Sequence, residues 1–535
     1  MRLAIVDEKK CEPKKCENLC ERICPRNKLK EKCIIIEKYA KIDENLCIGC
    51  GICSNRCPLE AIKIVNTPER HGNLIYRYGE NKFALYNLPV PEKGKIIGII
   101  GRNGIGKSTS LKILSKKLKI ENLPTMIRLY LQRNIKISYK PQILEKVEIN
   151  EISKDLIKKL NIKEKEHYSG GELQKLNIAK CLSKDADLYI LDEPTSYLDI
   201  FERLKIAKII KEYLSEKEVV IVEHDIAMMD YLADKIYILY GLPGAYGVVS
   251  SVYSTLKGIN AYLNGYLPTE NVKLRKNPIK FERHYQNVSD LETLIKFSNI
   301  KKKRGNFKLS INSGEIYRKE IIGVVGPNAI GKTTFAEILS GNIEVDEGNI
   351  EKKIKISYKP QYLYADVNST VKDILPENRE FKEHIAYPLH LETLYHKNVK
   401  ELSGGELQTV AIALCLSKDA DLYLLDEPSA FLDIENRLQF VKILQKIISM
   451  KDASAMIIDH DIHLIIQLSN RILLFNGVEG RYGEAKIEEP QFALNKFLKS
   501  IGITFRKDEE TGRYKVNKKE SQIDIKQKSM NRYLG

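Results

Sequence analysis

Two glycine-rich stretches of the sequence have residue types and spacing suited to holding phosphate groups. They are "GRNGIGKST" at residues 101–109 and "GPNAIGKTT" at residues 326–334. Glycines let backbone N–H groups turn toward phosphate oxygens, the lysine reaches the β- and γ-phosphates, and the hydroxyl after it binds Mg²⁺. Each stretch lies between an apolar segment and a helical one, as a Walker A loop does. The residues predicted to contact ATP here are Gly101, Asn103, Gly104, Gly106, Lys107, Ser108, Thr109, Gly326, Asn328, Gly331, Lys332, Thr333 and Thr334, of which Ser108 and Thr333 are also Mg²⁺ ligands.

Acidic pairs end two apolar segments further along the chain. Asp192 and Glu193 follow "ADLYIL", and Asp426 and Glu427 follow "ADLYLL". An aspartate at the end of such a strand is expected to hold Mg²⁺, directly or through water. The glutamate beside it is then placed to polarise the water that attacks ATP. The sequence therefore predicts two catalytic glutamates, one in each half of the chain.

A second kind of phosphate-binding stretch, "SGGELQ", begins at residue 169 and again at residue 403. Its glycines open a helix whose first N–H groups and positive dipole end favour an anion. Each half already has a Walker A loop for its own phosphates, so this stretch is expected to serve the ATP of the other half. The residues concerned are Ser169, Gly170, Gly171, Ser403, Gly404 and Gly405.

These motifs occur twice in the same order, with offsets that indicate a tandem duplication. Apolar strands that end in polar residues predict a parallel sheet with the nucleotide at the carboxyl ends of its strands. We therefore expect an α/β fold with two P-loop ATPase domains. The predicted domains are an iron–sulfur domain at 1–72, a first cassette at 73–240, a hinge segment at 241–292, a second cassette at 293–490 and a C-terminal hinge segment at 491–535.

Nine of the eleven cysteines lie before residue 58, which indicates metal binding in a cytosolic chain. The run Cys47-x2-Cys50-x2-Cys53-x3-Cys57-Pro has the spacing of a bacterial ferredoxin, and an upstream run is a stretched version of it. Two [4Fe–4S] clusters in a ferredoxin-like α+β domain are expected, with two zinc sites as the alternative. Since the fourth cysteine of each run binds the other cluster in such proteins, the expected sets are Cys47, Cys50, Cys53 and Cys24, and Cys11, Cys16, Cys20 and Cys57.

The formal net charge of +16 favours a polyanionic partner such as nucleic acid or a ribonucleoprotein. A lysine- and glutamate-rich surface typical of thermophiles is the alternative explanation. No apolar run approaches the length needed to cross a bilayer, and no signal peptide is apparent. The sequence thus predicts a cytoplasmic protein without a membrane domain.

The combination of motifs resembles the ATP-binding cassette family over residues 75–490. In that family two cassettes face each other head to tail and enclose two ATP molecules, which implies a monomer whose cassettes pair within the chain. The resemblance adds Gln142 and Gln361 as ATP and Mg²⁺ ligands, His224 and His460 as partners of the γ-phosphate in catalysis, and Tyr78 as an adenine-stacking ring. Site one would combine Lys107, Ser108, Gln142, Asp192, Glu193 and His224 with Ser403 and Gly405. Site two would combine Lys332, Thr333, Gln361, Asp426, Glu427 and His460 with Ser169 and Gly171.

Paired cassettes behind a two-cluster module resemble one family closely, the RNase L inhibitor proteins, or E subfamily of ATP-binding cassettes. The resemblance includes "KKCEPKKCENLCERICP", "YGLPGAYGVVS", "GYLPTEN" and "ITFRKD". Members act as ribosome-recycling factors in archaea and eukaryotes. The resemblance implies ATP-driven splitting of a ribosome that carries a release factor or its stalled-ribosome homologue, with the iron–sulfur domain as a mechanical element. Ribosomal RNA and the small subunit are the implied contacts.

One feature departs from that family, whose first cassette carries a helix-loop-helix insertion. Only 35 residues separate Lys107 from Gln142, against 29 from Lys332 to Gln361, so a full insertion does not fit. Two other functions remain open at this stage. One is an ATP-gated redox or cluster-transfer protein, and the other is the ATPase of a separate membrane transporter, which would have no need for the cysteine module.

Overall fold

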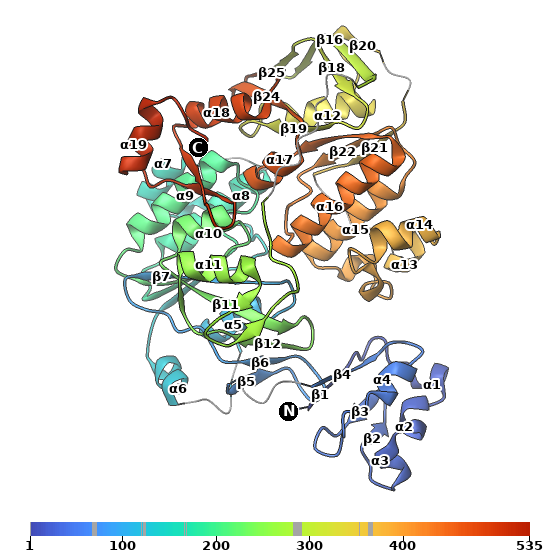
Figure 1. Ribbon diagram of the computed structural model, residues 1–535. Helices are drawn as coiled ribbons and strands as arrows, with labels where there is room; N and C mark the ends of the chain where they lie inside the picture. The colour runs from blue at the N-terminus through green and yellow to red at the C-terminus, as the bar shows by residue number, and fades with distance from the viewer. Residues whose placement is uncertain are drawn as a thin grey trace.

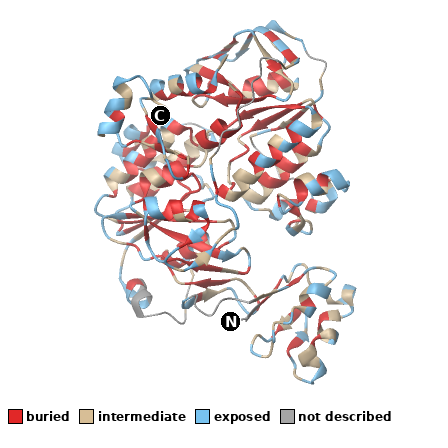
Figure 2. Ribbon diagram, in the orientation of Figure 1, coloured by how far each residue is buried: buried red, intermediate tan, exposed pale blue. Residues whose placement is uncertain are grey.

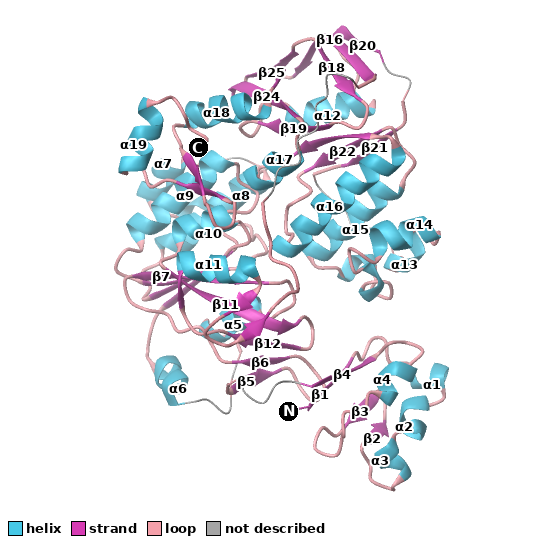
Figure 3. Ribbon diagram, in the orientation of Figure 1, coloured by secondary structure: helices cyan, strands magenta, loops and turns pink. Residues whose placement is uncertain are grey.

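The computed structural model describes residues 2–66, 72–118, 120, 125–164, 166, 168–281, 291–351, 354–361 and 368–535. Two cassettes face each other, and a small N-terminal module lies to one side of both (Figure 1). Among these residues, no helix has the length and apolar character that a membrane crossing requires. The described residues form three packed units, the N-terminal module and the two cassettes, together with two connecting segments (Figure 3).

The N-terminal module is an α+β unit with two small antiparallel sheets. β1 (Arg2–Val6) pairs with β4 (Ile62–Asn66), and β2 (Ile34–Ile36) pairs with β3 (Ala40–Ile42). Its helices are α1 (Pro13–Cys16), α2 (Leu19–Ile23), α3 (Pro25–Lys28) and α4 (Ile52–Arg56). Cys16, Cys20 and Cys53 lie in α1, α2 and α4, and α2 packs on α4. Opposed cysteine loops are the arrangement expected of a ferredoxin-like fold.

The first cassette is built on a parallel sheet with an antiparallel edge. β9 lies between β8 and β10, and β7 lies between β10 and β11. Its strands are β5 (Leu74–Arg77), β6 (Ala84–Tyr86), β7 (Lys95–Gly101), β8 (Ile137–Lys140), β9 (Leu188–Asp192), β10 (Glu218–Val222), β11 (Lys235–Leu242) and β12 (Tyr246–Val249). Its helices are α5 (Lys107–Leu114), α6 (Thr125–Gln132), α7 (Lys154–Leu160), α8 (Gly170–Ser183), α9 (Ile200–Tyr213) and α10 (Ile226–Leu232), with a short turn η1 (Ile149–Glu151).

The second cassette repeats this order, with the sheet β21-β22-β23-β19-β24 parallel throughout. Its strands are β16 (Thr293–Arg304), β17 (Phe307–Ile311), β18 (Gly314–Tyr317), β19 (Ile321–Val325), β20 (Glu347–Glu351), β21 (Ile356–Lys359), β22 (Leu422–Asp426), β23 (Ser454–Ile458), β24 (Arg471–Val478) and β25 (Tyr482–Glu488). Its longer helices are α12 (Lys332–Ser340), α15 (Gly404–Ser417), α16 (Ile434–Lys451) and α17 (Ile462–Leu468), with short helices α13 (Val371–Ile374) and α14 (Arg379–Phe381) and turns η2 (Lys382–Ala386), η3 (Leu391–Thr393) and η4 (Val399–Glu401).

The two copies differ between the Walker A helix and the next central strand. The first cassette has the single helix α6 there, whereas the second has β20, which pairs with β16. The described part of the segment between Lys107 and Gln142 therefore contains α6 in addition to the Walker A helix α5.

The described parts of the connecting segments touch both cassettes. β11 and β12 form a hairpin that continues the first sheet to Val249, so the predicted boundary at residue 240 falls inside this hairpin. β13 (Tyr253–Ser254), α11 (Thr255–Asn264), β14 (Tyr266–Leu267) and β15 (Val272–Lys273) follow. After the second cassette come α18 (Pro490–Ile501), β26 (Phe505–Lys507), β27 (Tyr514–Val516) and α19 (Gln522–Ser529). β27 packs against α10 of the first cassette.

Burial is concentrated in the central strands and the helix faces that cover them (Figure 2). β9, β10, β19, β22 and β23 are buried along their whole length. Continuous burial is typical of parallel strands covered on both faces. This packing fixes the strand ends, where the predicted site residues lie.

Candidate functional site

The two Walker A loops connect a buried strand to a helix in the same way. The first runs from β7 to α5 and the second from β19 to α12, with Gly106 and Gly331 at φ 102° and 96° just before each helix. A Cβ added to Gly106 would lie 2.8 Å from the Phe83 ring. Glycine is needed here because both the backbone angle and the close approach exclude a larger residue.

The Walker A lysines fold back into their own loops. Lys107 Nζ donates to the Gly101 carbonyl at 2.8 Å, and Lys332 Nζ donates to the Gly326 carbonyl at 2.8 Å. Burial lowers the pKa of both lysines, that of Lys332 to about 8. A phosphate group would supply the anionic partner that these buried cations need.

Each acidic pair is held by side chains from two other elements. Lys140 at the end of β8 donates to the carbonyls of Asp192 and Glu193 at 2.8 and 3.2 Å, and Gln174 of α8 donates to the Glu193 carbonyl at 2.7 Å. Glu193 and Glu427 both have left-handed backbone, at φ 49° and 47°. Such a conformation costs about 1–3 kcal/mol in a non-glycine residue and persists where its surroundings enforce it.

The second cassette repeats this support. Lys359 donates to the carbonyls of Asp426 and Glu427 at 2.7 and 3.3 Å, and Gln408 donates to that of Glu427 at 2.7 Å. Burial raises the pKa of Asp192 to about 6 and that of Asp426 to about 7. These are the carboxylates placed to meet a cation, and a bound cation would favour their charged form.

The predicted catalytic glutamates are each contacted by a glutamine and a histidine. Gln142 Nε2 donates to Glu193 Oε1 at 2.7 Å, and Gln361 Nε2 donates to Glu427 Oε1 at the same distance. His224 Nε2 lies 3.5 Å from Glu193 Oε1, and burial lowers the pKa of His224 well below its ordinary value. The imidazole is therefore neutral near pH 7 and can present one donor and one acceptor nitrogen.

The same pair of contacts occurs in the second cassette, where His460 Nε2 lies 3.6 Å from Glu427 Oε1. The two carboxylates nevertheless differ electrostatically. Burial and the neighbouring Asp192 raise the pKa of Glu193. The pKa of Glu427 is lowered, because His460 and Lys332 outweigh the effect of burial.

The SGGELQ stretches lie opposite the Walker A loops of the other cassette. A Cβ on Gly405 would come within 2.9 Å of Asn103 Nδ2. Asn103 N donates to Asp433 Oδ2 at 2.8 Å, and Asn328 N donates to Asp199 Oδ2 at 3.0 Å, both across the interface. Each predicted ATP site is thus completed by the other half of the chain.

Site two forms a large open cavity of about 1100 Å³. It brings together the predicted residues of both cassettes. Its lining includes Ser169, Gly171, Asn328, Gly331, Lys332, Thr333, Thr334, Gln361, Asp426 and Glu427. Both SGGELQ helices begin with a capping box, in which Ser169 and Ser403 cap the first turn. A cavity of this size, with helix N-termini and a lysine around it, suits a nucleoside triphosphate.

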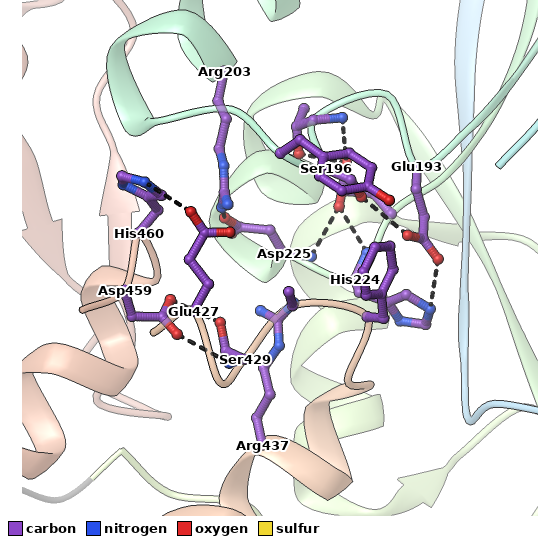
Figure 4. A pocket seen from close by; sticks show the side chains of 15 residues that line it. Glu193, Ser196, Arg203, His224, Asp225, Glu427, Ser429, Arg437, Asp459 and His460 are labelled. Atoms are coloured by element: carbon purple, nitrogen blue, oxygen red, sulfur yellow. Dashed lines mark hydrogen bonds and ion pairs between the residues drawn. The ribbon is translucent and has the colours of Figure 1, made fainter. Parts of the chain in front are cut away.

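A second pocket lies between the two acidic ends and faces both sites (Figure 4). Glu193 and His224 line one end of it, and Glu427 and His460 line the other. The rings of Tyr197 and Phe431 meet edge to face at 5.3 Å between their centroids. The segments that carry the two glutamates are therefore in direct contact across the interface.

The two sites have different side chains near the Walker A helices. Tyr78 donates or accepts a hydrogen bond with Thr109 at 3.2 Å beside α5, whereas Lys303 of β16 lies at the corresponding offset in the second cassette. At site one, Glu435 of α16 joins Arg102 and Arg275 in ion pairs of 3.1 and 2.6 Å. At site two, Pro327 takes the position of Arg102 and Phe201 takes the position of Glu435. Neither residue is charged, so this ion-pair link belongs to site one.

The interface aspartates lead to a testable prediction. Asp199 and Asp433 cap α9 and α16 while accepting from the opposite Walker A loop. Asparagine keeps the cap but loses the charge, so Asp199→Asn or Asp433→Asn is expected to weaken ATP-dependent closure by about 1 kcal/mol. Alanine substitutions should cost more. Fluorescence energy transfer between labels on the two cassettes measures this. Asp185→Asn, at a side chain 80% exposed, is the control, and equal closure in all variants would contradict the assignment.

Cysteines of the two runs lie close enough in the module to act on one another's thiols. Burial raises the pKa of Cys20 to about 12, and Cys11, Cys16 and Cys57 are among the charges that act on it. Burial raises the pKa of Cys53 to about 11, with contributions from its neighbours Cys47, Cys50 and Cys24. Cys33 is buried next to Cys24. In the part of the chain that the structure describes, no three Cys, His, Asp or Glu side chains converge on a point that would hold a single metal ion.

Several residues that shape the site were not among the sequence predictions. They are Lys140, Lys359, Gln174 and Gln408, which hold the glutamate backbones, and the Asp199–Asn328 and Asp433–Asn103 contacts. The two lysines and two glutamines lie inside the repeated stretches "SYKPQ" and "SGGELQ". Recurrence of the same lysine in both copies of "SYKPQ" was the signal that could have identified the lysines.

Comparison with known proteins agrees with this architecture. The ABC transporter family model matches residues 121–196 and 309–430, the 4Fe-4S binding domain model matches 40–63, and the model of a possible Fer4-like domain in RNase L inhibitor matches 1–32. An uncharacterised ABC transporter ATP-binding protein of Methanocaldococcus jannaschii is 43% identical, with 100% of this chain and 97% of that protein aligned. ABC transporter E family member 1 of Arabidopsis thaliana is 38% identical, with 99% and 98% aligned.

Solved structures agree as well. A structure of ribosome-bound archaeal Pelota and ABCE1 contains a chain 40% identical to this one, with a TM-score of 0.94 over 100% of this chain and 99% of that chain. A complex of the archaeal ribosomal stalk protein aP1 with the archaeal ribosome recycling factor aABCE1 contains a chain 39% identical, with a TM-score of 0.79 over 88% and 100%.

Two cassettes that complete each other's nucleotide sites define an ATPase of the ATP-binding cassette class. Two further findings identify the family within this class: relatives align over the full chain, and the iron–sulfur family models match its N-terminal residues. The chain belongs to the RNase L inhibitor family, the E subfamily of that class.

Proposed function

We propose that this chain uses ATP-driven closure of its cassettes to split ribosomes into subunits. The observation that carries the proposal is that each ATP site is built from both cassettes of one chain. ATP bound at either site would contact both halves and favour the closed arrangement, and hydrolysis would release it. The solved relatives named above are bound to a ribosome or described as a recycling factor, which favours this function over ATP-gated electron transfer.

The N-terminal module is placed to respond to closure because it contacts both cassettes. Arg77, the last residue of β5, pairs with Glu44 of the module through two hydrogen bonds. Lys9 of the module pairs with Glu401, just before the SGGELQ helix of the second cassette, at 2.7 Å. A change in the angle between the cassettes would therefore move the module or break one of these contacts. We assign to it the role of a mechanical element that is pushed between the ribosomal subunits.

In this proposal the polar residues of the two ATP sites have the roles expected from the sequence. Glu193 and Glu427 activate water, and His224 and His460 contact the γ-phosphate. Ser108, Thr333, Gln142 and Gln361 hold Mg²⁺, with Asp192 and Asp426 beside it, while Lys107 and Lys332 bind the β- and γ-phosphates. Tyr78 would stack on adenine at site one.

The cysteine sets fit two [4Fe–4S] clusters. Cys47, Cys50, Cys53 and Cys24 would hold one, and Cys11, Cys16, Cys20 and Cys57 the other. The four thiols of a cubane bind four different irons and surround the cluster, whereas a zinc site needs all four to converge on one ion. Bound clusters would cross-link loops that share few apolar contacts.

The proposed partners are the ribosome, through its small subunit and ribosomal RNA, and a release factor or its stalled-ribosome homologue. The net charge of +16 suits contact with RNA phosphates, and the proposed location is the cytoplasm. We also propose that the protein acts as a monomer, since its two cassettes complete both sites within one chain.

Sedimentation of intact ribosomes tests this function. Ribosomes, ATP, release factor and the protein are expected to yield separated subunits, and omission of ATP should prevent it. The matched control is the Glu193→Gln/Glu427→Gln variant, which should bind without repeated splitting. An unchanged subunit fraction with the active ATPase present would contradict the proposal.

A further inference from the structure

The two catalytic glutamates differ in the contact made by their second carboxylate oxygen. Both have Oε1 engaged by a glutamine at 2.7 Å and a histidine at 3.5–3.6 Å. At site one, the Ser196 hydroxyl also donates to Glu193 Oε2 at 3.0 Å. The second cassette has Ala430 at this position, and a methyl group cannot donate to Glu427. The carboxylate of site one is therefore held through both oxygens by its own cassette.

The loop that carries Ser196 is fixed in space. Thr195 Oγ1 donates to Glu223 Oε2 at 2.6 Å, and Tyr197 takes a left-handed backbone at φ 64°. Asp199 then caps α9 and accepts from Asn328 of the other cassette. A hydroxyl on such a loop is already oriented, so it loses little freedom when it bonds to Glu193.

The second cassette provides the same loop without the hydroxyl. Ser429 Oγ donates to Asp459 Oδ1 at 2.8 Å, Phe431 has φ 61°, and Asp433 caps α16. The backbone frame thus matches that of the first cassette, and the difference at Ala430 is confined to one side-chain oxygen. Because the two loops otherwise match, comparing hydrolysis at the two sites isolates the effect of the Ser196 hydroxyl.

Binding of Mg²⁺ and ATP is expected to break the Gln142 hydrogen bond to Glu193 and to leave the Ser196 hydrogen bond in place. In the proposed function, Gln142 turns to Mg²⁺ and gives up Glu193 Oε1. The Ser196 contact lies on the other side of the carboxylate, within the same short segment 193–196, and needs no rearrangement. In the pocket between the sites, Arg203 of the first cassette pairs with Asp225 at 2.7 Å, and its charge also acts on the Glu427 carboxylate of site two (Figure 4).

We propose that Ser196 is a positioning residue for hydrolysis at site one, with no counterpart at site two. It orients the Glu193 carboxylate toward the attacking water. Site two depends instead on approach of the opposite cassette to orient Glu427. This inference rests on the proposed roles of Glu193 and Glu427 as catalytic bases. If it holds, the difference between Ser196 and Ala430 would make the rates of ATP hydrolysis at the two sites unequal.

Single-turnover hydrolysis in variants with one active site tests the inference. Glu427→Gln leaves site one as the hydrolysing site, and Glu193→Gln leaves site two. Adding Ser196→Ala to the first is expected to lower the rate constant about tenfold, the equivalent of one hydrogen bond to a charged group. The ATP concentration giving half of the maximal rate should stay within about twofold. Ser196→Thr, which keeps the hydroxyl, should restore most of the rate.

The reciprocal change distinguishes positioning from damage to the fold. Ala430→Ser in the Glu193→Gln background is expected to raise the site-two rate severalfold, which a merely structural role for Ser196 would not produce. Ser529→Ala, at an exposed hydroxyl that donates to the Lys526 carbonyl within the C-terminal helix, is the control for removal of a serine. An unchanged site-one rate in Ser196→Ala, or an unchanged site-two rate in Ala430→Ser, would overturn the inference.

The double variant Glu193→Gln/Glu427→Gln separates this inference from the proposed function. If it loses hydrolysis while Ser196→Ala in the single-site background does not, the glutamates are the bases and only the role of Ser196 fails. If the double variant still hydrolyses ATP, the assigned roles of Glu193 and Glu427 fail, and the inference fails with them.

Discussion

Replacing both Glu193 and Glu427 by glutamine is expected to lower ATP turnover by about 10²–10⁴-fold, the usual contribution of a general base. Glutamine has the same shape and can still meet Gln142 or Gln361, but it cannot accept a proton from water. The Asn103–Asp433 and Asn328–Asp199 hydrogen bonds between the cassettes involve neither glutamate. ATP should therefore stay bound and hold the cassettes closed. Phosphate release measures turnover, and nucleotide retained after gel filtration measures trapping.

The single variants add a second level to this prediction. Each should trap ATP at one site, and their residual turnover should differ because Tyr78 and Ser196 belong to site one alone. Glu216→Gln, at an exposed position between α9 and β10, is the matched control and should behave like the unaltered protein. Equal turnover in both single variants would remove the claim of inequivalence, and full turnover in the double variant would contradict the catalytic roles.

The sequence was sufficient to predict the fold class, and its motifs indicated where a candidate site would lie, because the motifs depend on local chemistry. A phosphate loop needs glycines at fixed positions, and Gly106 indeed has a backbone angle that other residues avoid. Continuous apolar runs before Asp192 and Asp426 predicted buried parallel strands, and β9 and β22 are buried throughout. Because the motifs are repeated in the same order, the elements of the second cassette could be predicted from those of the first.

Contacts between distant segments could not be predicted in the same way. The Lys140 ammonium bonds to carbonyls about fifty residues further along the chain, and no residue type marks a carbonyl acceptor in the sequence. The Asp433 contact with Asn103 spans 330 residues and depends on how the cassettes face each other. The extension of the first sheet to Val249 was missed for a related reason, since its glycine-rich hairpin resembles a linker.

The left-handed backbone of Glu193 also lay beyond sequence analysis. Glutamate has no preference for this region, so the conformation must be enforced by Lys140 and Gln174. Gln174 belongs to the SGGELQ helix that faces site two, yet its side chain holds the glutamate of site one. Tertiary packing thus joins two motifs that the sequence presents as separate.

Loss of one cysteine set is expected to lower the iron content of the protein and to destabilise the N-terminal module. Cys20→Ser and Cys53→Ser should each remove about half of the bound iron, because each residue belongs to a different set. The core of the module contains Ala4, Val6, Ile34, Ala40, Ile42 and Ile62 besides four cysteines. So few apolar side chains stabilise a small domain poorly without cross-links. Iron content, visible absorbance and hydrogen exchange over residues 2–66 measure the outcome.

The cassettes should survive this loss, because the cysteine-lined core of the module is a cluster of its own and the module meets a core of the first cassette through the partly buried Ile5 and Val65. Basal ATP hydrolysis is therefore expected to persist in Cys20→Ser and Cys53→Ser, while ribosome splitting is lost with the rigidity of the module. Cys33→Ala is the matched control, because Cys33 is a buried cysteine outside both sets. It should keep the full iron content. Splitting that continues in a chain without iron would contradict the mechanical role, and zinc in place of iron would contradict the clusters themselves.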